Sequence, residues 1–273
     1  MSEATRAQVS FDTCVDRRLV HRRAVGEVFI TSIIPAGEKR WTCGVQISRG
    51  HMRAPHKGGA LPIPLVIEAS RQAGLAISHV GLEVGLDQQY LLDEVTVLFP
   101  DHHPVVPCDA PFEAELEVAV VSVRYRQGKV CGLTFAGSWI VAGSVVVIAT
   151  ASMRCISAAN YPALRRRAAV PERRVEVPTA PLSAGPNGQR VVGWKPHDPL
   201  LFDHPVDHVP GMALIDAMLS IDPFPDTFTV RFHQFAELSE LVAAHIRTTS
   251  TSRTFTFAQG SEVVASGKTV SRP

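Results

Sequence analysis

The sequence predicts an α+β fold in which two antiparallel sheets are each wrapped around a central helix. One apolar helical pattern is followed by four strand patterns, and the same order then occurs a second time. Strand and helix patterns do not alternate, which favours an antiparallel sheet over a parallel one. Pairing the two copies side by side would cover their exposed sheet edges, so we expect a pseudo-twofold dimer within one chain.

The first copy has its predicted helix at Pro64–His79, where apolar residues recur at every fourth position, and Gly81 is the expected stop. Four runs of strand-forming residues follow, and turns rich in Gly, Pro and Asp separate them. They predict strands at Tyr90–Phe99, Phe112–Arg126, Lys129–Val141 and Ser144–Ile156.

The second copy has its predicted helix at Gly211–Ile221, and Asp216–Ala217 aligns there with Glu68–Ala69 of the first. Its predicted strands are Thr227–Phe235, Leu241–Thr249, Ser252–Ala258 and Glu262–Val270. Between the copies lies a proline-rich stretch with little hydrophobic periodicity. We therefore expect a first repeat at 1–160, a linker at 161–187 and a second repeat at 188–273.

Composition excludes several classes of protein. The 27 Lys and Arg residues nearly balance the 26 Asp and Glu residues, so nothing in the net charge of +1 indicates binding to nucleic acid or an anionic membrane. The five cysteines include no C-x-x-C pair, which favours free thiols over disulfides or a zinc site. The N-terminus does not resemble a signal peptide, and no apolar run is long enough to cross a bilayer, so we expect a cytoplasmic protein.

The densest group of reactive side chains is the stretch His197–Met212, directly before the second helix. It holds three histidines, three aspartates and several prolines, which is typical of a rigid polar loop. The amides of Gly211 and Met212 would open the helix without acceptors, and such groups can polarise a thioester carbonyl. Asp207 and His208 are alternatively simple caps of that helix. A metal site from His204, Asp207 and His208 is disfavoured, because their spacing matches no strong metal motif.

A second group of polar side chains, Glu68, Arg71 and Gln72, interrupts the apolar first helix. Glu68 and Arg71 are three residues apart and share a helix face. They form either a partly buried functional pair or an exposed ion pair that stabilises the fold weakly. The pattern alone favours neither interpretation.

Three strings resemble the A-factor biosynthesis hotdog family: Val20–Ile30, Glu68–Gly74 and Leu201–Met212. The resemblance covers nearly the whole chain and implies a tandem (double) hotdog fold similar to that of thioester dehydratases. It also implies an acyltransferase that needs no cofactor or metal. Such an enzyme condenses a β-ketoacyl group on acyl carrier protein with the hydroxyl of dihydroxyacetone phosphate or a similar small alcohol. The ester then leads to γ-butyrolactone, butenolide or furan signals in actinomycetes.

The resemblance places the family's helix acid and arginine on Glu68 and Arg71. In the second copy the corresponding positions hold Asp216 and Leu219, and Leu219 cannot pair with an anion. We therefore expect one working composite site. Copy one would supply Glu68 and Arg71, and copy two would supply His204 or His208 and the Gly211 amide for the oxyanion. The reciprocal pocket, which pairs the loop around His51 and His56 with Asp216 and Leu219, is expected to be degenerate. Further substrate-binding positions are Gln72, Asp207, Met212 and Asp216.

In that composite site, Glu68 or a loop histidine would take the proton of the acceptor hydroxyl. Arg71 would bind the phosphate or restrain Glu68. Two alternatives remain open at the level of the sequence: a hydratase or dehydratase of β-hydroxyacyl thioesters, and a non-catalytic acyl-binding protein. The chain is expected as a monomeric pseudo-dimer or as a homodimer.

Overall fold

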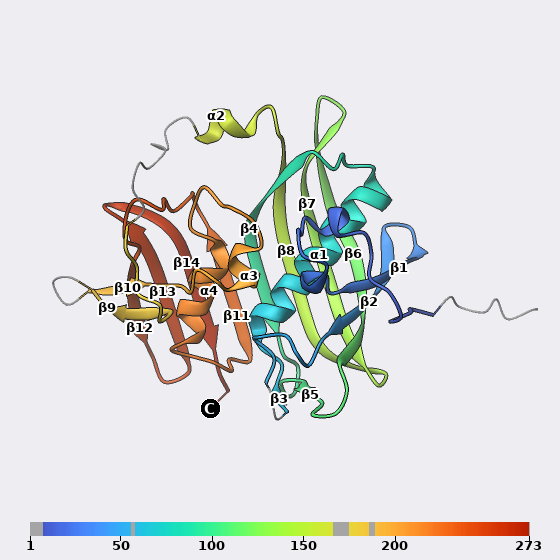
Figure 1. Ribbon diagram of the computed structural model, residues 1–273, viewed down its shortest axis with the longest axis horizontal. Helices are drawn as coiled ribbons and strands as arrows, with labels where there is room; N and C mark the ends of the chain where they lie inside the picture. Colours follow the sequence, from blue (N-terminus) through green and yellow to red (C-terminus); the bar gives the residue numbers. More distant parts are fainter. Residues whose placement is uncertain (1–7, 56–57, 166–174, 186–188, 273) are drawn as a thin grey trace, which may run out of the picture.

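The computed structural model describes residues 8–55, 58–165, 175–185 and 189–272 of the chain. Within them, twelve strands form one antiparallel sheet in the order β1-β2-β6-β7-β8-β4-β11-β14-β13-β12-β10-β9. The two expected sheets are therefore joined into one continuous sheet (Figure 1). The strands of the first half are β1 (Ile30–Gly37), β2 (Arg40–Ile47), β4 (Gln88–Leu98), β6 (Phe112–Arg126), β7 (Lys129–Val141) and β8 (Ser144–Ser157).

The second half has the same order of elements as the first. Its strands are β9 (Leu182–Ala184), β10 (Arg190–Val192), β11 (Thr227–Phe232), β12 (Ala243–Thr248), β13 (Ser252–Gln259) and β14 (Glu262–Val270). Counted outward from the β4–β11 pair, the first half runs β4, β8, β7, β6, β2, β1, and the second runs β11, β14, β13, β12, β10, β9. In each half a long helix precedes the innermost strand: α1 (Ile63–Leu82) precedes β4, and α4 (Gly211–Leu219) precedes β11.

The two halves meet through the edge strands β4 and β11. Five residue pairs form this ladder, from Leu98 opposite Thr227 to Glu94 opposite Arg231. An ion pair of 2.6 Å joins Arg231 to Glu94 across the junction. Without this pairing, β4 and β11 would each be an exposed edge strand with unpaired backbone groups. Each half therefore covers one edge of the other, as expected from the sequence.

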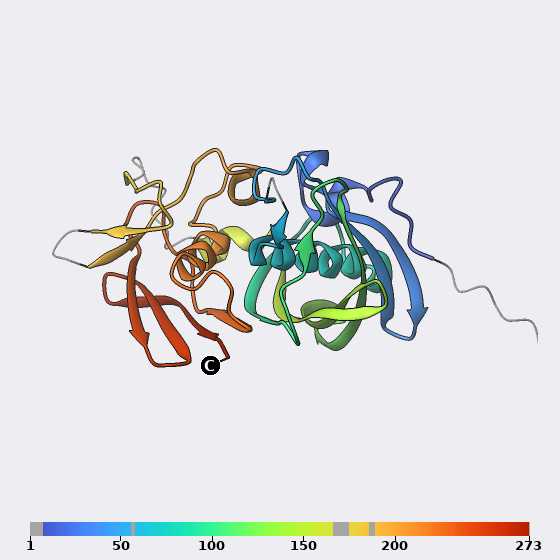
Figure 2. The same ribbon diagram turned by 90° about the horizontal axis from the view of Figure 1, so that it is seen from below.

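The helices α1 and α4 lie on the same side of the sheet, and Figure 2 shows them next to each other above the strands. A mostly apolar sequence makes α1 suitable for burial, and most of its residues are buried in the core. The remaining elements are short: η1 (Arg17–Val20), η2 (Val25–Glu27), α2 (Tyr161–Arg165), α3 (Pro199–Phe202) and the small pair β3 (Gly59–Ala60) and β5 (Val105–Val106).

Most of the predicted strands are confirmed. The ends of β6, β7 and β14 agree with the sequence pattern, and β11 stops three residues earlier than expected. The loops β6–β7 and β7–β8 are two-residue turns with positive φ at both positions, 52° and 73° in the first and 48° and 79° in the second. This is the backbone that a twisted hairpin requires.

The expected helix stop at Gly81 is wrong. The helix α1 continues through Gly81 to Leu82 and ends at Glu83, which has a left-handed φ of 54°. Gly81 is needed for packing instead, because a Cβ atom there would collide with the indole of Trp41. Trp41 belongs to β2, a strand that the sequence pattern did not reveal.

Two further features bear on the predictions. The segment expected as a linker contains α2 and the short edge strand β9 in its described part. All five cysteines are free thiols, as the spacing indicated, and Cys43 and Cys155 are buried. In the described part of the chain, no helix has both the length and the apolar character of a transmembrane helix.

Candidate active site

Glu68 is the centre of a buried charged network on α1. Its side chain is 2% exposed and accepts hydrogen bonds from two arginines. Arg71, one turn further along the helix, donates Nε to Oε2 and Nη2 to Oε1, both at 2.8 Å. Arg22, from the segment after η1, donates Nε to Oε1 at 2.9 Å and places Nη2 2.6 Å from the same oxygen. The sequence left open whether Glu68 and Arg71 form a partly buried pair or an exposed ion pair, and these contacts support the partly buried pair.

The two arginines keep this carboxylate ionised. Burial alone would raise the pKa of Glu68, but the charges of Arg22 and Arg71, together with hydrogen bonds from Arg71 and Gln72, lower it to about 2. A carboxylate so strongly stabilised is a poor base at neutral pH. Glu68, Asp203 and Glu27 all act on Arg22, whereas Arg71 is the guanidinium of this network that lines an apolar pocket.

Gln72 is fully buried and fixes the N-terminal segment onto α1. Its Nε2 donates to Glu68 Oε1 at 2.8 Å and to the Glu27 carbonyl at 2.7 Å, and its Oε1 accepts from the Phe29 amide at 2.8 Å. These bonds use both ends of the amide, so Gln72 acts here as a structural clamp behind Glu68.

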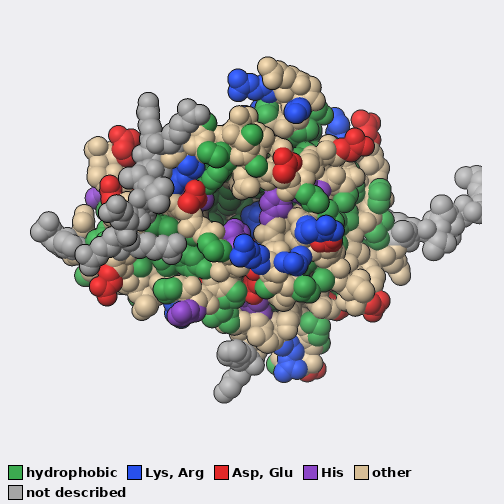
Figure 3. Space-filling view, turned by 45° about the horizontal axis from the view of Figure 1, so that its top comes forward, with side chains coloured by type: hydrophobic (Ala, Val, Ile, Leu, Met, Phe, Trp, Pro, Cys, Tyr) green, Lys and Arg blue, Asp and Glu red, His purple; other side chains and the backbone are tan. Residues whose placement is uncertain are grey.

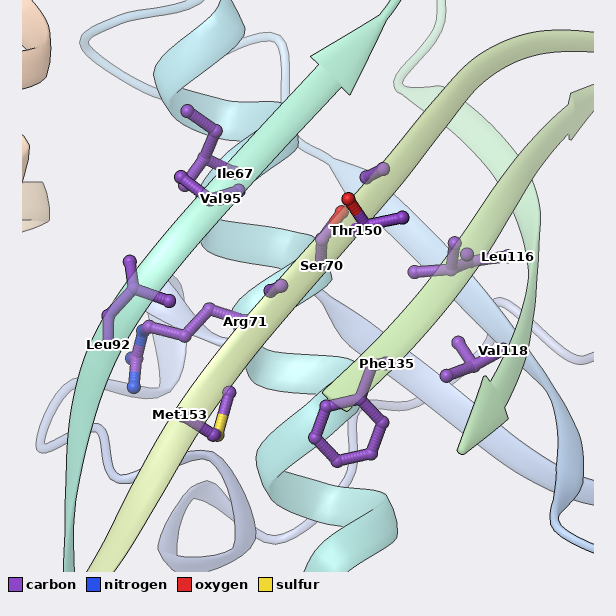
Figure 4. A pocket seen from close by; sticks show the side chains of 13 residues that line it. Ile67, Ser70, Arg71, Leu92, Val95, Leu116, Val118, Phe135, Thr150 and Met153 are labelled. Carbon is purple, nitrogen blue, oxygen red and sulfur yellow. The ribbon is translucent and has the colours of Figure 1, made fainter. Parts of the chain in front are cut away.

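A narrow apolar pocket lies between α1 and the sheet, and Arg71 lines one side of it (Figure 4). Its other lining residues come from α1, β4, β6, β7 and β8 and are mostly apolar: Ile67, Ser70, Leu92, Val95, Leu116, Val118, Phe135, Gly137, Ala149, Thr150, Ala151 and Met153. Arg71 thus joins an apolar pocket to the Glu68 network. Its Nη1 has no partner among the described residues.

The loop of the second half reaches this network. Arg22 directs its Nη1 and Nη2 at the carbonyls of Pro199 and Leu200, at 3.4 and 3.5 Å. The Asp203 carboxylate accepts from the backbone amides of Arg23 and Ala24, at 2.5 and 2.9 Å. The segment after η1 and the loop around α3 are therefore fastened together directly above Glu68.

His204 lies near the same network, whereas His208 has other neighbours. His204 Nδ1 lies 3.6 Å from Asp203 Oδ2, and Asp203 binds the amides of Arg23 and Ala24, next to Arg22. His208 instead donates Nδ1–H to the Asp207 carboxylate, at 2.7 Å, and its ring stands edge-on to Phe235 with 4.8 Å between centroids. On the face shown in Figure 3, histidine and basic side chains gather around a hollow.

Asp207 belongs to a second charged cluster at the base of α2. Besides His208, its carboxylate accepts from Tyr161 Oη at 3.0 Å and from Arg165 Nε at 3.0 Å. Arg165 also pairs with Glu237 at 2.8 Å. The hydrogen bond from His208 and the charge of Arg165 lower the pKa of Asp207. No contact of the described residues joins this cluster to Glu68.

Asp216 on α4 has an arginine partner that its own helix does not supply. Arg53, from the loop before α1, binds both carboxylate oxygens of Asp216 at 2.7 Å and donates Nε to Asp198 at 2.9 Å. Burial raises the pKa of the Asp216 carboxyl more than the pairing with Arg53 lowers it. Arg53 thus fills the role that Leu219 cannot, and it does so from the other half of the chain.

The residues that open α4 are close-packed. A Cβ atom on Gly211 would meet the ring of Phe232 at 2.8 Å, so the site admits only glycine without a shift of that ring. Met212 is half-buried against the core. The Ala213 amide donates to the Pro210 carbonyl at 2.9 Å, which leaves the amides of Gly211 and Met212 as the helix-opening donors that could face a ligand oxygen.

Sequence reasoning missed Arg22, Arg53, His21 and His79, all of which contact predicted site residues or their neighbours. Arg22 and His21 lie within the string Val20–Ile30, whose resemblance to a family was the available signal. Arg53 gave no signal, because a lone arginine in a loop does not disclose its partner. His56, which the sequence placed in the reciprocal pocket, lies outside the described residues.

The sequence is similar to a known protein family and to named proteins of Streptomyces. Residues 4–157 match the A-factor biosynthesis hotdog domain. The chain is 33% identical over 252 residues to the 2-oxo-3-(phosphooxy)propyl 3-oxoalkanoate synthase of Streptomyces virginiae, covering 82% of this chain and 84% of that protein. It is 29% identical over 251 residues to the synthase of the same name from Streptomyces griseus, covering 80% of each.

Two thioesterases are similar in structure. An acyl-ACP thioesterase from Bacteroides thetaiotaomicron has a TM-score of 0.55 at 13% identity, covering 85% of this chain and 98% of that one. The 12:0-ACP thioesterase from Umbellularia californica has a TM-score of 0.55 at 12% identity, covering 88% of this chain and 100% of that one. At these identities the similarity concerns the fold alone.

Proposed function

Because the chain belongs to the A-factor biosynthesis hotdog family, we propose that it is an acyltransferase that joins a 3-oxoacyl group to the hydroxyl of dihydroxyacetone phosphate or a similar small alcohol. The relatives' name describes such an ester, a 3-oxoalkanoate of a phosphorylated three-carbon keto alcohol. The acyl donor in this proposal is a thioester on acyl carrier protein, and the ester is a precursor of γ-butyrolactone-type signals. We place the enzyme in the cytoplasm.

The observation that carries the proposal is the position of Arg71. It lines the apolar pocket on one side and pairs with buried Glu68 on the other. An apolar pocket suits the alkyl part of a 3-oxoacyl chain, and a guanidinium with a free Nη1 suits a phosphate or keto oxygen. Glu68 then serves to hold Arg71, because its pKa of about 2 makes it a weak base.

In the proposed site the second half contributes from its loop. His204 is favoured over His208 as the loop histidine, because its neighbour Asp203 binds the segment that carries Arg22, whereas His208 pairs with Asp207. The Gly211 amide, at the positive end of α4, would stabilise the thioester oxyanion. Asp216 and Arg53 form the degenerate counterpart of the pair Glu68 and Arg71.

We also propose that the chain is a tandem double hotdog with repeats at 1–160 and 188–273 and a connection at 161–187. The equal strand order of the two halves on either side of the β4–β11 pair supports this division. The shared edge explains how one chain can act as its own pseudo-dimer.

The function is tested by mixing the purified protein with a 3-oxoacyl thioester, with and without dihydroxyacetone phosphate. We expect thiol release only when the acceptor is present, and a product with the mass of the phosphorylated ester. Release without acceptor would indicate a thioesterase, and a product changed by one water would indicate a hydratase. Tight thioester binding without turnover would indicate an acyl-binding protein.

The role of Arg71 is tested with Arg71→Met, which keeps most of the side-chain volume. Loss of charge-assisted hydrogen bonds worth about 1.5–3 kcal/mol should raise KM for the phosphorylated acceptor by roughly 10- to 150-fold. Arg154→Met is the matched control, because Arg154 pairs with Asp93 on the exposed part of the sheet at 2.7 Å. An unchanged KM in Arg71→Met would contradict the assignment.

A further inference from the structure

Two histidines beside Arg71 form a hydrogen-bonded pair. The Nε2 atoms of His21 and His79 are 3.0 Å apart, and their rings are stacked with 5.2 Å between centroids. His79, on α1, places its Nδ1 2.7 Å from the Val84 carbonyl. A carbonyl oxygen can only accept, so the Nδ1 of His79 carries a proton.

This contact determines the tautomers of both rings. A neutral His79 that is protonated at Nδ1 presents a lone pair at Nε2, so the Nε2 of His21 must be the donor between them. The Nδ1 of a neutral His21 then carries a lone pair. That atom has no partner in the described part of the chain and is not among its buried unpartnered atoms, so solvent or a ligand can reach it.

The backbone holds His21 in this place at a conformational cost. His21 ends η1 with a left-handed φ of 55°, a conformation that costs energy for any residue with a side chain, although His, Asn and Asp adopt it more often than the others. The Val20 carbonyl, one residue earlier, accepts from Arg71 Nη2 at 3.4 Å. The residue before His21 is thus hydrogen-bonded to the guanidinium that lines the apolar pocket.

The surroundings keep His21 neutral. Burial, the charge of Arg71, and the neighbouring His79 and His204 lower its pKa to about 4. Tyr90 of β4 is the other titratable group that faces it, edge-on at 5.3 Å. A phosphate bound at Arg71 would offset the positive charge there and make His21 more basic at the moment the acceptor is present.

We propose that His21 is the general base of the acyl transfer and that His79 positions it, an inference that rests on the proposed function. The Nδ1 of His21 takes the proton of the acceptor hydroxyl as that oxygen attacks the thioester carbonyl. The carbon–sulfur bond then breaks, and the imidazolium returns the proton to the leaving thiolate. The products are the ester and the free thiol, and His21 ends neutral, as it began.

The variants follow from the geometry of His21. Asn tolerates a left-handed φ and can still donate to His79, so His21→Asn removes the base while retaining the fold. We expect kcat to fall by about 10²–10⁴ with KM for the acceptor changed by less than threefold. His245→Asn, an exposed residue on β12, is the matched control and should retain full activity.

Chemical rescue separates a catalytic role from a structural one. His21→Gly suits the positive φ and leaves a space for exogenous imidazole, which should restore turnover at least tenfold in a concentration-dependent way. His79→Phe keeps an aromatic ring but removes the Nε2 atom that accepts from His21. We expect kcat to fall about tenfold while KM for the acceptor alcohol is unchanged.

The outcomes are distinguishable from those of the function test. If the unmodified protein releases no thiol with any acceptor, the proposed function fails. If the unmodified protein is active and His21→Asn keeps more than a fifth of its kcat, the base is another group and this inference is overturned. The absence of imidazole rescue in a folded His21→Gly protein would also count against it.

Discussion

Replacing Glu68 by Gln would remove the carboxylate that separates the buried guanidinium of Arg22 from the half-buried one of Arg71. The pKa of Glu68 is lowered from 4.5 to about 2, and its side chain is 2% exposed, so solvent does little to screen the change. One pKa unit corresponds to about 1.4 kcal/mol, which makes the ionised form worth about 3 kcal/mol to the folded state. Breaking a buried ion pair generally costs about 3–5 kcal/mol, a similar magnitude.

The assay is thermal unfolding at several pH values. In a chain of this size, 1 kcal/mol shifts Tm by roughly 2–4 °C, so Glu68→Gln should melt about 6–12 °C lower at pH 7. The carboxyl of Glu68 has a lowered pKa in the folded state. Its stabilisation is therefore complete above pH 4.5 and is lost as the pH falls toward about 2. The Tm of Glu68→Gln and the Tm of the unmodified protein should therefore converge as the pH falls from 4.5 toward 2.

Glu94→Gln is the control for this experiment. Glu94 also pairs with an arginine, at 2.6 Å, but its side chain is 34% exposed and the pair should contribute less than about 1 kcal/mol. A Tm of Glu68→Gln within 2 °C of the unmodified protein at pH 7 would refute the reasoning. So would a difference in Tm that persists unchanged at pH 3.

Three further predictions concern other parts of the structure. Arg53→Met should destabilise the fold by about 3–5 kcal/mol in denaturant titrations. Arg53→Met combined with Asp216→Leu should lose less stability than the sum of the two single changes, because only the Asp198 carboxylate is then left without Arg53; additive losses would contradict a direct pair. Gly81→Ala should lower Tm although alanine favours helices by about 1 kcal/mol, because the new Cβ meets Trp41; a raised Tm would show that the indole moves aside. Ala149→Phe should narrow the pocket between α1 and the sheet and lower kcat/KM at least tenfold more for a long 3-oxoacyl thioester than for a short one; equal losses would place the acyl chain elsewhere.

Local patterns explain why much of the fold could be predicted. The strands β6, β7 and β8 are long and strand-forming, and the turns between them carry glycine where a positive φ is needed. The strands β1 and β2 were missed because they precede the first clear helix and have weaker turn signals. Gly81 was misread as a stop because sequence alone does not show that a tryptophan side chain packs against that glycine.

Some contacts of the candidate site could also be predicted from the sequence, and others could not. Glu68, Arg71 and Gln72 are close in sequence on one helix, so their spacing predicted a shared network, and the contacts among them confirm it. His204 and His208 are also close in sequence, yet their partners differ. Asp203, the partner of His204, binds the segment after η1, whereas Asp207, the partner of His208, binds Arg165. No periodicity reports such a difference.

By itself, the sequence determined the fold class, the repeat of helix and strands, the family, and the charged group on the first helix, because each depends on the order or spacing of neighbouring residues. The tertiary structure alone decided which distant groups meet that helix. Arg22 reaches Glu68 across 46 positions, Arg53 reaches Asp216 across 163, and His21 reaches His79 across 58. Charges and hydrogen bonds act over a few ångströms of space, and only the folded chain fixes those distances.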